Sequence, residues 1–106
     1  MEKQLKFSEP LPQLIMDKEK DTTWRINDDK HIVKGDMLSL CALDGKEFAR
    51  AKVLWTRETI FSGLSERDKE GHENFSSDEE RYKTYSRYYN LKVTPKTKVK
   101  VIKFKL

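Results

Sequence analysis

The sequence predicts a small α+β protein, a β-barrel of about five or six short strands with one short and one longer helix. Three observations favour this class. The turn pair Asp44-Gly45 lies between two apolar runs, which is a strong hairpin signal. Four tyrosines between Tyr82 and Tyr89 recur at helical spacing. The last segment, residues 98–106, mixes lysines with Val, Ile and Phe and predicts a strand that closes the barrel.

Composition limits the chain to one domain and to a few classes of protein. Its 106 residues, 36% apolar and 38% charged, suffice for a single domain covering residues 1–106. No apolar run is long enough to span a membrane and the N-terminus lacks a signal-peptide core, so we expect a soluble, cytoplasmic monomer with no membrane partner. Cys41 and two scattered histidines predict neither an internal disulfide nor a metal site, and we expect no cofactor. The net charge of +4 permits a nucleic-acid partner without establishing one.

The first half of the chain predicts one short helix and most of the strands. Residues 5–7 are expected to be extended, and Ser8 is expected to cap a helix that covers roughly residues 11–15. A strand should begin near Thr22. Further strands are expected at residues 37–43 and 48–56, on either side of the hairpin turn.

The second half predicts the longer helix and the closing strand. Ser76 and Glu79 have the spacing of a capping box at the start of the tyrosine helix. The tyrosines are expected to pack against the barrel rather than to stack on bases. The phase of the apolar pattern changes at Val101-Ile102, which predicts either a bulge in the last strand or a strand that runs past a corner of the barrel. The buried set is expected to include Tyr82, Tyr85, Tyr89, Leu38, Leu40 and Val53.

The candidate site is the segment from Lys20 to Arg25. A strand that begins near Thr22 places Thr23 and Arg25 on one face, and Lys20 can fold back over that face from the preceding turn. A hydroxyl becomes a useful nucleophile when a neighbouring base takes its proton, and a neutral amine can do so. That role needs burial or a nearby cation to lower the pKa of the lysine. The alternative is a solvated loop whose basic side chains pair with Asp17, Glu19 and Asp21.

Three motifs in order resemble the ASCH family, whose members are small barrels similar to the PUA fold. Lys20, Thr23 and Arg25 match the end of the family's Gly-x-Lys-x-x-Thr-x-Arg motif. Gly35-Asp36 and Glu70-Gly71-His72 match two later motifs. The chain departs from the first motif at Lys18, which stands where the family has glycine, so Lys18 either needs an ordinary φ or crowds the pocket.

The resemblance implies a reaction, because one branch of very small members is similar to N4-acetylcytidine amidohydrolases. It would make Thr23 the nucleophile, Lys20 its base and Glu70 the proton carrier to the leaving amine, with Glu73 as the alternative to Glu70. Arg25 would orient the substrate or lower the pKa of Lys20. The residues expected to bind substrate are Arg25, Trp24, Glu73 and Trp55.

The function expected from this resemblance is removal of the acetyl group from N4-acetylcytidine or a related modified nucleoside. A small barrel that binds a protein partner is one alternative. Two more stay open: a non-catalytic RNA-binding module with exposed aromatics, and a ribonuclease acting on single-stranded RNA. Both would use basic residues outside the motif, namely Lys52, Lys98 and Lys100. Lysines on an edge strand also prevent pairing with other chains. Lys98 and Lys100 therefore have two possible roles, phosphate contact and protection of an edge strand.

Overall fold

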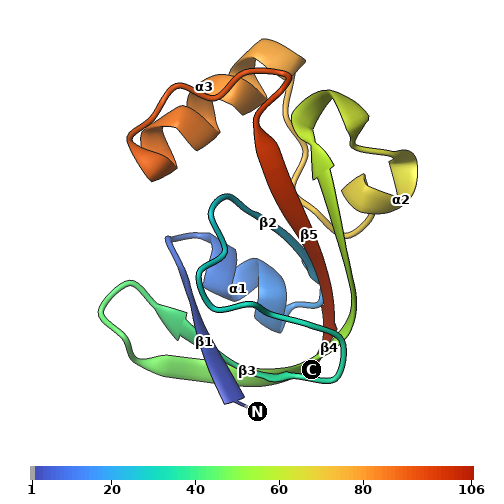
Figure 1. Cartoon of the computed structure of the whole chain (residues 1–106). Coiled ribbons are helices and arrows are strands. Elements are labelled where there is room, and N and C mark those ends of the chain that lie inside the picture. Colours follow the sequence, from blue (N-terminus) through green and yellow to red (C-terminus); the bar gives the residue numbers. More distant parts are fainter. Residues whose placement is uncertain (1) are drawn as a thin grey trace.

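The computed structural model describes residues 2–106, and its five strands form one sheet in the order β1-β3-β4-β5-β2 (Figure 1). The strands are β1 (Glu2–Phe7), β2 (Thr22–Arg25), β3 (Met37–Ala42), β4 (Glu47–Ile60) and β5 (Lys98–Lys105). The helices are α1 (Leu11–Met16), α2 (Glu66–Lys69) and α3 (Asp78–Tyr89), with a 3-10 turn at Phe61–Gly63. The predicted α+β class is confirmed, and α2 is a further short helix.

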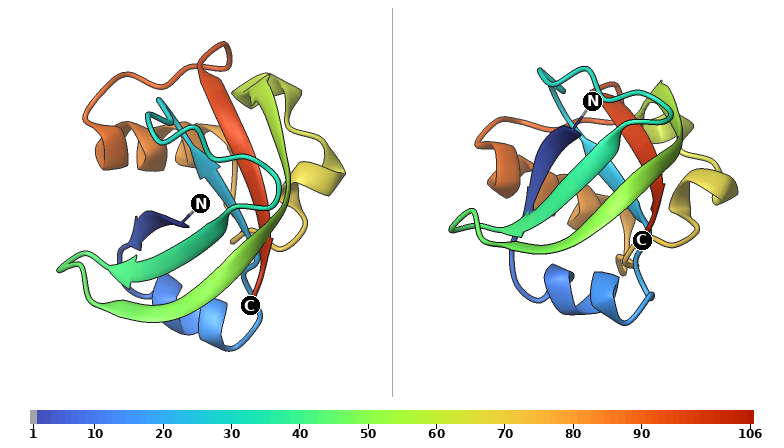
Figure 2. Two further views of the ribbon diagram at one scale, coloured as in Figure 1. Left: turned by 60° about the horizontal axis from the view of Figure 1, so that its bottom comes forward. Right: turned by 90° about the horizontal axis from the view of Figure 1, so that it is seen from below.

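The sheet is mixed and curls into a half-barrel (Figure 2). Strand β1 runs parallel to β3, and the other three neighbouring pairs are antiparallel. Strands β1 and β2 are the two ends of the sheet. Arg25 of β2 donates a hydrogen bond from its guanidinium to the carbonyl oxygen of Lys6 in β1 at 3.1 Å. A side chain therefore joins the two ends where the backbone ladder stops.

The predicted hairpin is confirmed, with Asp44 and Gly45 in the turn between β3 and β4. Strand β4 runs four residues past the expected end at residue 56, because its second half pairs with β5. The irregularity expected at Val101-Ile102 lies instead in β4, between Val53 and Trp55. Of the two alternatives predicted from the phase change, the bulge was therefore placed in the wrong strand of this pair.

Strand β5 explains why the apolar phase changes in the last segment. Its residues Val99 and Val101 pack with a core cluster beside α3, whereas Ile102 and Phe104 pack with a second cluster inside the half-barrel. Side chains on a strand alternate between faces, so consecutive buried residues mean that both faces are covered. The strand thus separates the two clusters.

The buried set predicted from the sequence is largely confirmed. Leu38, Leu40 and Val53 are fully buried in the cluster inside the half-barrel. Tyr85 is 4% exposed in the cluster beside α3. The remaining tyrosines of that helix are less buried: Tyr82 and Tyr89 are intermediate, and Tyr88 is 52% exposed.

The helix starts differ from the expected ones by one or two residues. Helix α1 has Pro10 at its N-cap and no side-chain cap, so the assignment of Ser8 as the cap was wrong. Helix α3 is capped by Ser77, whose hydroxyl accepts from the Glu80 N–H at 3.1 Å, one residue later than predicted. Ser76 instead donates its hydroxyl proton to the Glu80 carboxylate.

No helix within residues 2–106 is both long enough and apolar enough to cross a membrane.

Candidate active site

A cavity of about 340 Å³ opens between the two ends of the sheet and α3. Its lining combines charged and hydroxyl groups with aromatic walls. The polar side chains that line it include Lys6, Lys20, Thr23, Arg25 and Glu73. The aromatic ones are Phe7, Trp24, Tyr85, Tyr88 and Tyr89. Lys20, Thr23 and Arg25, which the sequence picked out, therefore share one hollow with Glu73.

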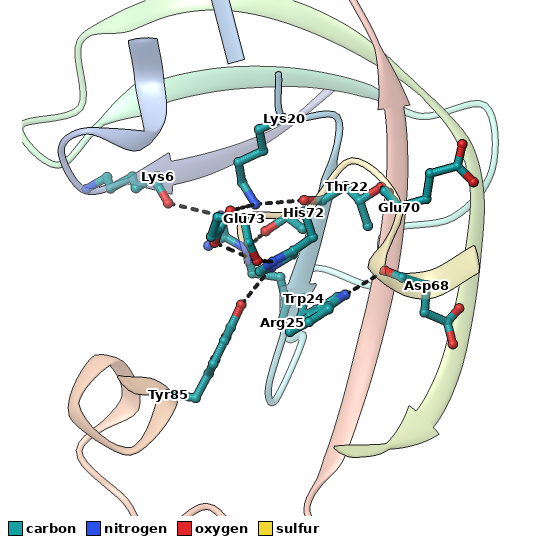
Figure 3. Close-up of polar contacts among 11 residues, drawn as sticks. Lys6, Lys20, Thr22, Trp24, Arg25, Asp68, Glu70, His72, Glu73 and Tyr85 are labelled. Carbon is teal, nitrogen blue, oxygen red and sulfur yellow. Dashed lines mark hydrogen bonds and ion pairs between the residues drawn. The ribbon is translucent and has the colours of Figure 1, made fainter. Parts of the chain in front are cut away.

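Lys20 is buried at the centre of the site, with 2% of its surface exposed. Its Nζ donates to the Thr22 carbonyl oxygen and to Glu73 Oε2, each at 2.7 Å (Figure 3). Burial lowers the pKa of Lys20 to about 8, although the Glu73 carboxylate opposes this change. The solvated-loop alternative is therefore wrong for Lys20, and Asp21 pairs with Lys103 instead.

Thr23 and Arg25 lie on the same face of β2, as the alternation of a strand requires. The Thr23 side chain is buried, and its Oγ1 accepts a hydrogen bond from Arg25 Nε at 3.1 Å. The Arg25 guanidinium also lies over the Phe7 ring, 4.6 Å from its centroid. The hydroxyl oxygen thus faces a fixed cation, while its own proton remains available to a base.

The structure separates the two glutamates that the sequence left as alternatives. The Glu70 side chain is exposed and points away from Lys20, and it does not line the cavity (Figure 3). Its backbone carbonyl oxygen accepts from the Thr22 hydroxyl at 2.7 Å. Glu73 is the glutamate that reaches Lys20, whereas Glu70 lies outside this cavity.

The turn at Gly71 determines which of the two glutamates reaches Lys20. Its carbonyl oxygen accepts from the backbone N–H groups of Asp21 and Thr22, at 2.9 and 3.1 Å. Its φ is +78°, a value that favours glycine. The turn at Gly71 joins residues 70–73 to the start of β2 and places Glu73 beside Lys20.

Of the two tryptophans expected to bind substrate, Trp24 lines the cavity and Trp55 does not. Trp24 is 3% exposed and donates from Nε1 to the Asp68 carbonyl oxygen at 2.9 Å, so it is a wall of the cavity rather than an exposed stacking platform. Trp55 lies under the Arg67 guanidinium, 4.5 Å from the ring centroid, and does not line the cavity. The structure therefore does not bring Trp55 together with Lys20 and Thr23.

The candidate nucleic-acid lysines lie outside the cavity. Lys52 on β4 and Lys98 on β5 are exposed. Lys100 pairs with Asp28 at 2.7 Å and donates to the Ile32 carbonyl oxygen at 2.8 Å. Two of the three lysines are thus open to a polyanion, and the third is held by the protein.

Lys18, which replaces the glycine of the motif, adopts a φ of +63°. This is the left-handed conformation that glycine takes most easily. Its side chain is exposed and lines a second hollow, on the other side of Lys20, rather than the cavity that Thr23 lines. The substitution therefore keeps the turn and does not crowd the cavity.

Two further residues of the site are His72, which the sequence marks only as part of a motif, and Tyr85, which the sequence predicts only as a core residue. His72 is 6% exposed, with Nδ1 at 2.9 Å from the Glu73 carbonyl oxygen and Nε2 at 3.0 Å from the Tyr85 hydroxyl. Burial, reinforced by the positive charge of Lys20, lowers the pKa of His72 to about 2. Burial also raises the pKa of Tyr85 well above its ordinary value. In the sequence, His72 stands out only as a motif residue and Tyr85 only as one of several tyrosines at helical spacing. Neither pattern indicates that the two side chains are in contact.

Comparison with known proteins shows the fold. No family model and no curated protein matches the chain. Among solved structures, it is similar to an ASCH domain from Lactobacillus crispatus, with a TM-score of 0.64, 18% identity, and coverage of 89% of this chain and 68% of that one. It is also similar to the hypothetical protein PH0355, with a TM-score of 0.76, 25% identity, and coverage of 99% of this chain and 98% of that one.

Protein PF0455 from Pyrococcus furiosus is similar over the whole chain as well, with a TM-score of 0.66, 28% identity, and coverage of 99% of this chain and 96% of that one. The chain therefore has an ASCH-like fold, as its motifs predicted.

Proposed function

We propose that the protein is an amidohydrolase that removes the acetyl group from N4-acetylcytidine or a related modified nucleoside. One observation carries the proposal: Lys20, Thr23 and Glu73 line a single cavity, and burial lowers the pKa of Lys20 to about 8. A neutral amine, a hydroxyl and a carboxylate are the groups that amide hydrolysis requires as base, nucleophile and proton carrier.

The size and walls of the cavity support a nucleoside-sized substrate. Its volume of about 340 Å³ lies at the lower end of the range for small-molecule sites. The rings of Phe7, Tyr85 and Tyr89 give it flat apolar walls, against which a base can pack. The charged groups that line the same space can hold the polar acetamide.

In the proposed first step, Thr23 Oγ1 attacks the acetyl carbonyl carbon, and the neutral amine of Lys20 takes the hydroxyl proton. Glu73, whose Oε2 is 2.7 Å from Lys20 Nζ, passes that proton to N4 as the carbon–nitrogen bond breaks and cytidine leaves. Water then hydrolyses the acetyl-threonine ester, which releases acetate and restores Thr23. Arg25 holds the nucleophilic oxygen in place throughout.

The test is incubation with N4-acetylcytidine, followed by chromatographic detection of cytidine and acetate. Thr23→Val keeps the shape and removes the hydroxyl, so it should abolish hydrolysis while the fold remains intact. Glu73→Gln should reduce kcat/KM by about 10²- to 10⁴-fold, the usual contribution of a proton-transfer group. Glu70→Gln is the matched control and should keep wild-type activity, because that side chain is outside the cavity. Full activity in Thr23→Val would sink the nucleophile assignment.

Lys20→Arg separates the role of a base from that of a fixed cation. Arginine stays protonated in proteins and cannot supply a neutral amine. If Lys20 is the base, Lys20→Arg should be as inactive as Lys20→Ala. Activity retained in Lys20→Arg alone would show that the positive charge is what matters.

A second candidate, a non-catalytic RNA-binding module, is favoured by the rim of the cavity. There Tyr88 is 52% exposed and Lys6 is exposed, so an aromatic face and a cation are open to a nucleotide chain. This alternative expects wild-type protein to bind RNA that contains acetylcytidine and to release no cytidine from it.

A further inference from the structure

A chain of hydrogen bonds connects the backbone of Glu73 to the hydroxyl of Tyr85 through His72. His72 Nδ1 lies 2.9 Å from the Glu73 carbonyl oxygen, and Nε2 lies 3.0 Å from the Tyr85 hydroxyl oxygen. Tyr85 reaches these groups from α3, on the opposite side of the site from Lys20 (Figure 3). The direction of each hydrogen bond follows from the chemistry of its partners.

A carbonyl oxygen carries no hydrogen, so His72 Nδ1 must be the protonated nitrogen. A second proton on the ring would place a buried cation near Lys20 and Arg81, which is unfavourable. Nε2 also lies 3.4 Å from Glu73 Oε1, a contact that alone would favour a proton on Nε2. The shorter contact of Nδ1 with the Glu73 carbonyl oxygen, at 2.9 Å, holds the proton on Nδ1 instead, so Nε2 is bare and can only accept. It follows that the Tyr85 hydroxyl donates its single hydrogen to His72.

The packing of the ring holds this arrangement. His72 stacks on Trp24 with centroids 3.6 Å apart and planes inclined by 11°. Trp24 is itself fixed by its hydrogen bond to the Asp68 carbonyl oxygen. A half-turn of the imidazole would break both of its hydrogen bonds, and a smaller turn would also break the stacking.

We propose that the Tyr85 hydroxyl oxygen can only accept a hydrogen bond from a ligand in the cavity and cannot donate one. Tyr85 would therefore select ligands whose amide nitrogen carries a hydrogen. Tyr85 lines the cavity, and its only hydroxyl hydrogen is used by His72, so the lone pairs of its oxygen are left for a ligand. This rests on the proposed function and narrows its substrate class to secondary amides. N4-acetylcytidine has one such N–H, and Tyr85 would hold it while Glu73 delivers the second proton to the nitrogen.

The first test uses a pair of probes, N4-acetylcytidine and N4-acetyl-N4-methylcytidine, which differ in the N–H. Their affinities are measured by calorimetry on Thr23→Val, with and without Tyr85→Phe. Adding Tyr85→Phe should weaken the N–H probe by about tenfold, the effect of one hydrogen bond to a buried group, and should change the methylated probe by less than about twofold. Tyr82→Phe, on the same helix but outside the cavity, should alter neither affinity.

Equal weakening of both probes would make Tyr85 a structural residue and overturn the inference, as would failure of N4-acetylcytidine itself to bind. Binding with this selectivity but without hydrolysis by the wild type would sink the proposed reaction and leave the selectivity intact. Hydrolysis by the wild type without this selectivity would support the proposed reaction and overturn the inference about Tyr85.

The second test needs no ligand. Nitrogen-15 NMR of labelled histidine should show His72 as the neutral Nδ1–H tautomer, with exposed His31 as the reference for a ring in solvent. A proton on Nε2 would reverse the hydrogen bond to Tyr85 and overturn the inference.

Discussion

At the scale of the residue, the chemistry of the cavity depends on the solvation of Lys20. The chain buries an amine and gives it one carboxylate and one carbonyl oxygen as partners. Burial outweighs these partners and lowers the pKa to about 8, so roughly one amine in ten is neutral at pH 7. The Arg25 charge acts in the same direction as burial. A base is therefore available near neutral pH.

The pH dependence of hydrolysis follows from this pKa. Only the neutral amine can accept the Thr23 proton, so kcat/KM for N4-acetylcytidine should rise about tenfold per pH unit below pH 8 and level off above it. The measurement is a rate profile between about pH 6 and pH 10. If kcat/KM instead fell as the pH rose through 8, Lys20 would act as a cation and the base assignment would be wrong.

The sequence identified the residues of this site that lie close together in the chain. Lys20, Thr23 and Arg25 share a face because a strand alternates, which can be deduced from spacing alone. The choice between Glu70 and Glu73 depends on a turn at Gly71, and an irregular loop has no period from which to deduce direction. The contact between His72 and Tyr85 joins a loop to a helix across thirteen residues, so no local pattern indicates it.

At the scale of the element, Gly71 is the residue on which the loop and β2 depend. A Cβ at this position would lie 1.8 Å from Asp21 Oδ1 and 3.1 Å from Lys103 Nζ, the two atoms of a 2.7 Å ion pair. Gly45 in the hairpin turn has a similar φ, +90° against +78°, but a Cβ there would have no atom within 4 Å beyond its chain neighbours. The two glycines thus share a backbone requirement and differ in the space around them.

Gly71→Ala should accordingly destabilise the protein more than Gly45→Ala does. The left-handed backbone should cost both variants about 1 to 2 kcal/mol. Displacing Asp21 should add about 1 to 3 kcal/mol to Gly71→Ala alone. Chemical denaturation measures both losses, and hydrolysis should fall only in Gly71→Ala, because Glu73 moves with the loop. Equal losses of stability would mean that Asp21 gives way freely and that the loop is not tightly docked.

Elements that are marked by nearby residues in the sequence were predicted better than elements whose extent depends on pairing with a distant strand. The Asp44-Gly45 hairpin and the tyrosine helix follow from turn residues and spacing. The length of β4 does not, because its polar second half is a strand through pairing with β5, which lies too far along the chain for a short window of sequence to contain both. The cap of α3 moved by one residue because two consecutive serines can both begin a helix.

At the scale of the whole molecule, the site lies where the sheet fails to close. The sheet ends at β1 and β2, and Arg25 bridges them through the Lys6 carbonyl oxygen. The same guanidinium contacts the Thr23 hydroxyl, so the residue that joins the ends also orders the proposed nucleophile. The ASCH-like fold thus places a polar opening beside a hydrophobic core without breaking a strand ladder.

The charge of the whole molecule gives the last prediction, which concerns RNA. From sequence, the lysines of β5 formed one basic face, but Lys100 is held by Asp28 while Lys98 is exposed. If single-stranded RNA contacts this surface, its affinity should fall with added salt, and Lys98→Gln should reduce the slope of log affinity against log salt by about 0.7, the effect of one phosphate contact. Lys100→Gln is the matched control and should leave the slope unchanged, because its ammonium already has a carboxylate partner.

Fluorescence anisotropy with a labelled single-stranded RNA, over about 50 to 200 mM salt, measures both slopes. Denaturation of the two variants separates the roles further. Lys100→Gln should lower stability, since it removes the cation that pairs with Asp28 and the donor to Ile32, whereas exposed Lys98 should be replaceable at little cost. Identical slopes for wild type and Lys98→Gln would show that Lys98 is not a phosphate ligand; protection of an edge strand does not explain it either, because β5 lies between β4 and β2 in the sheet.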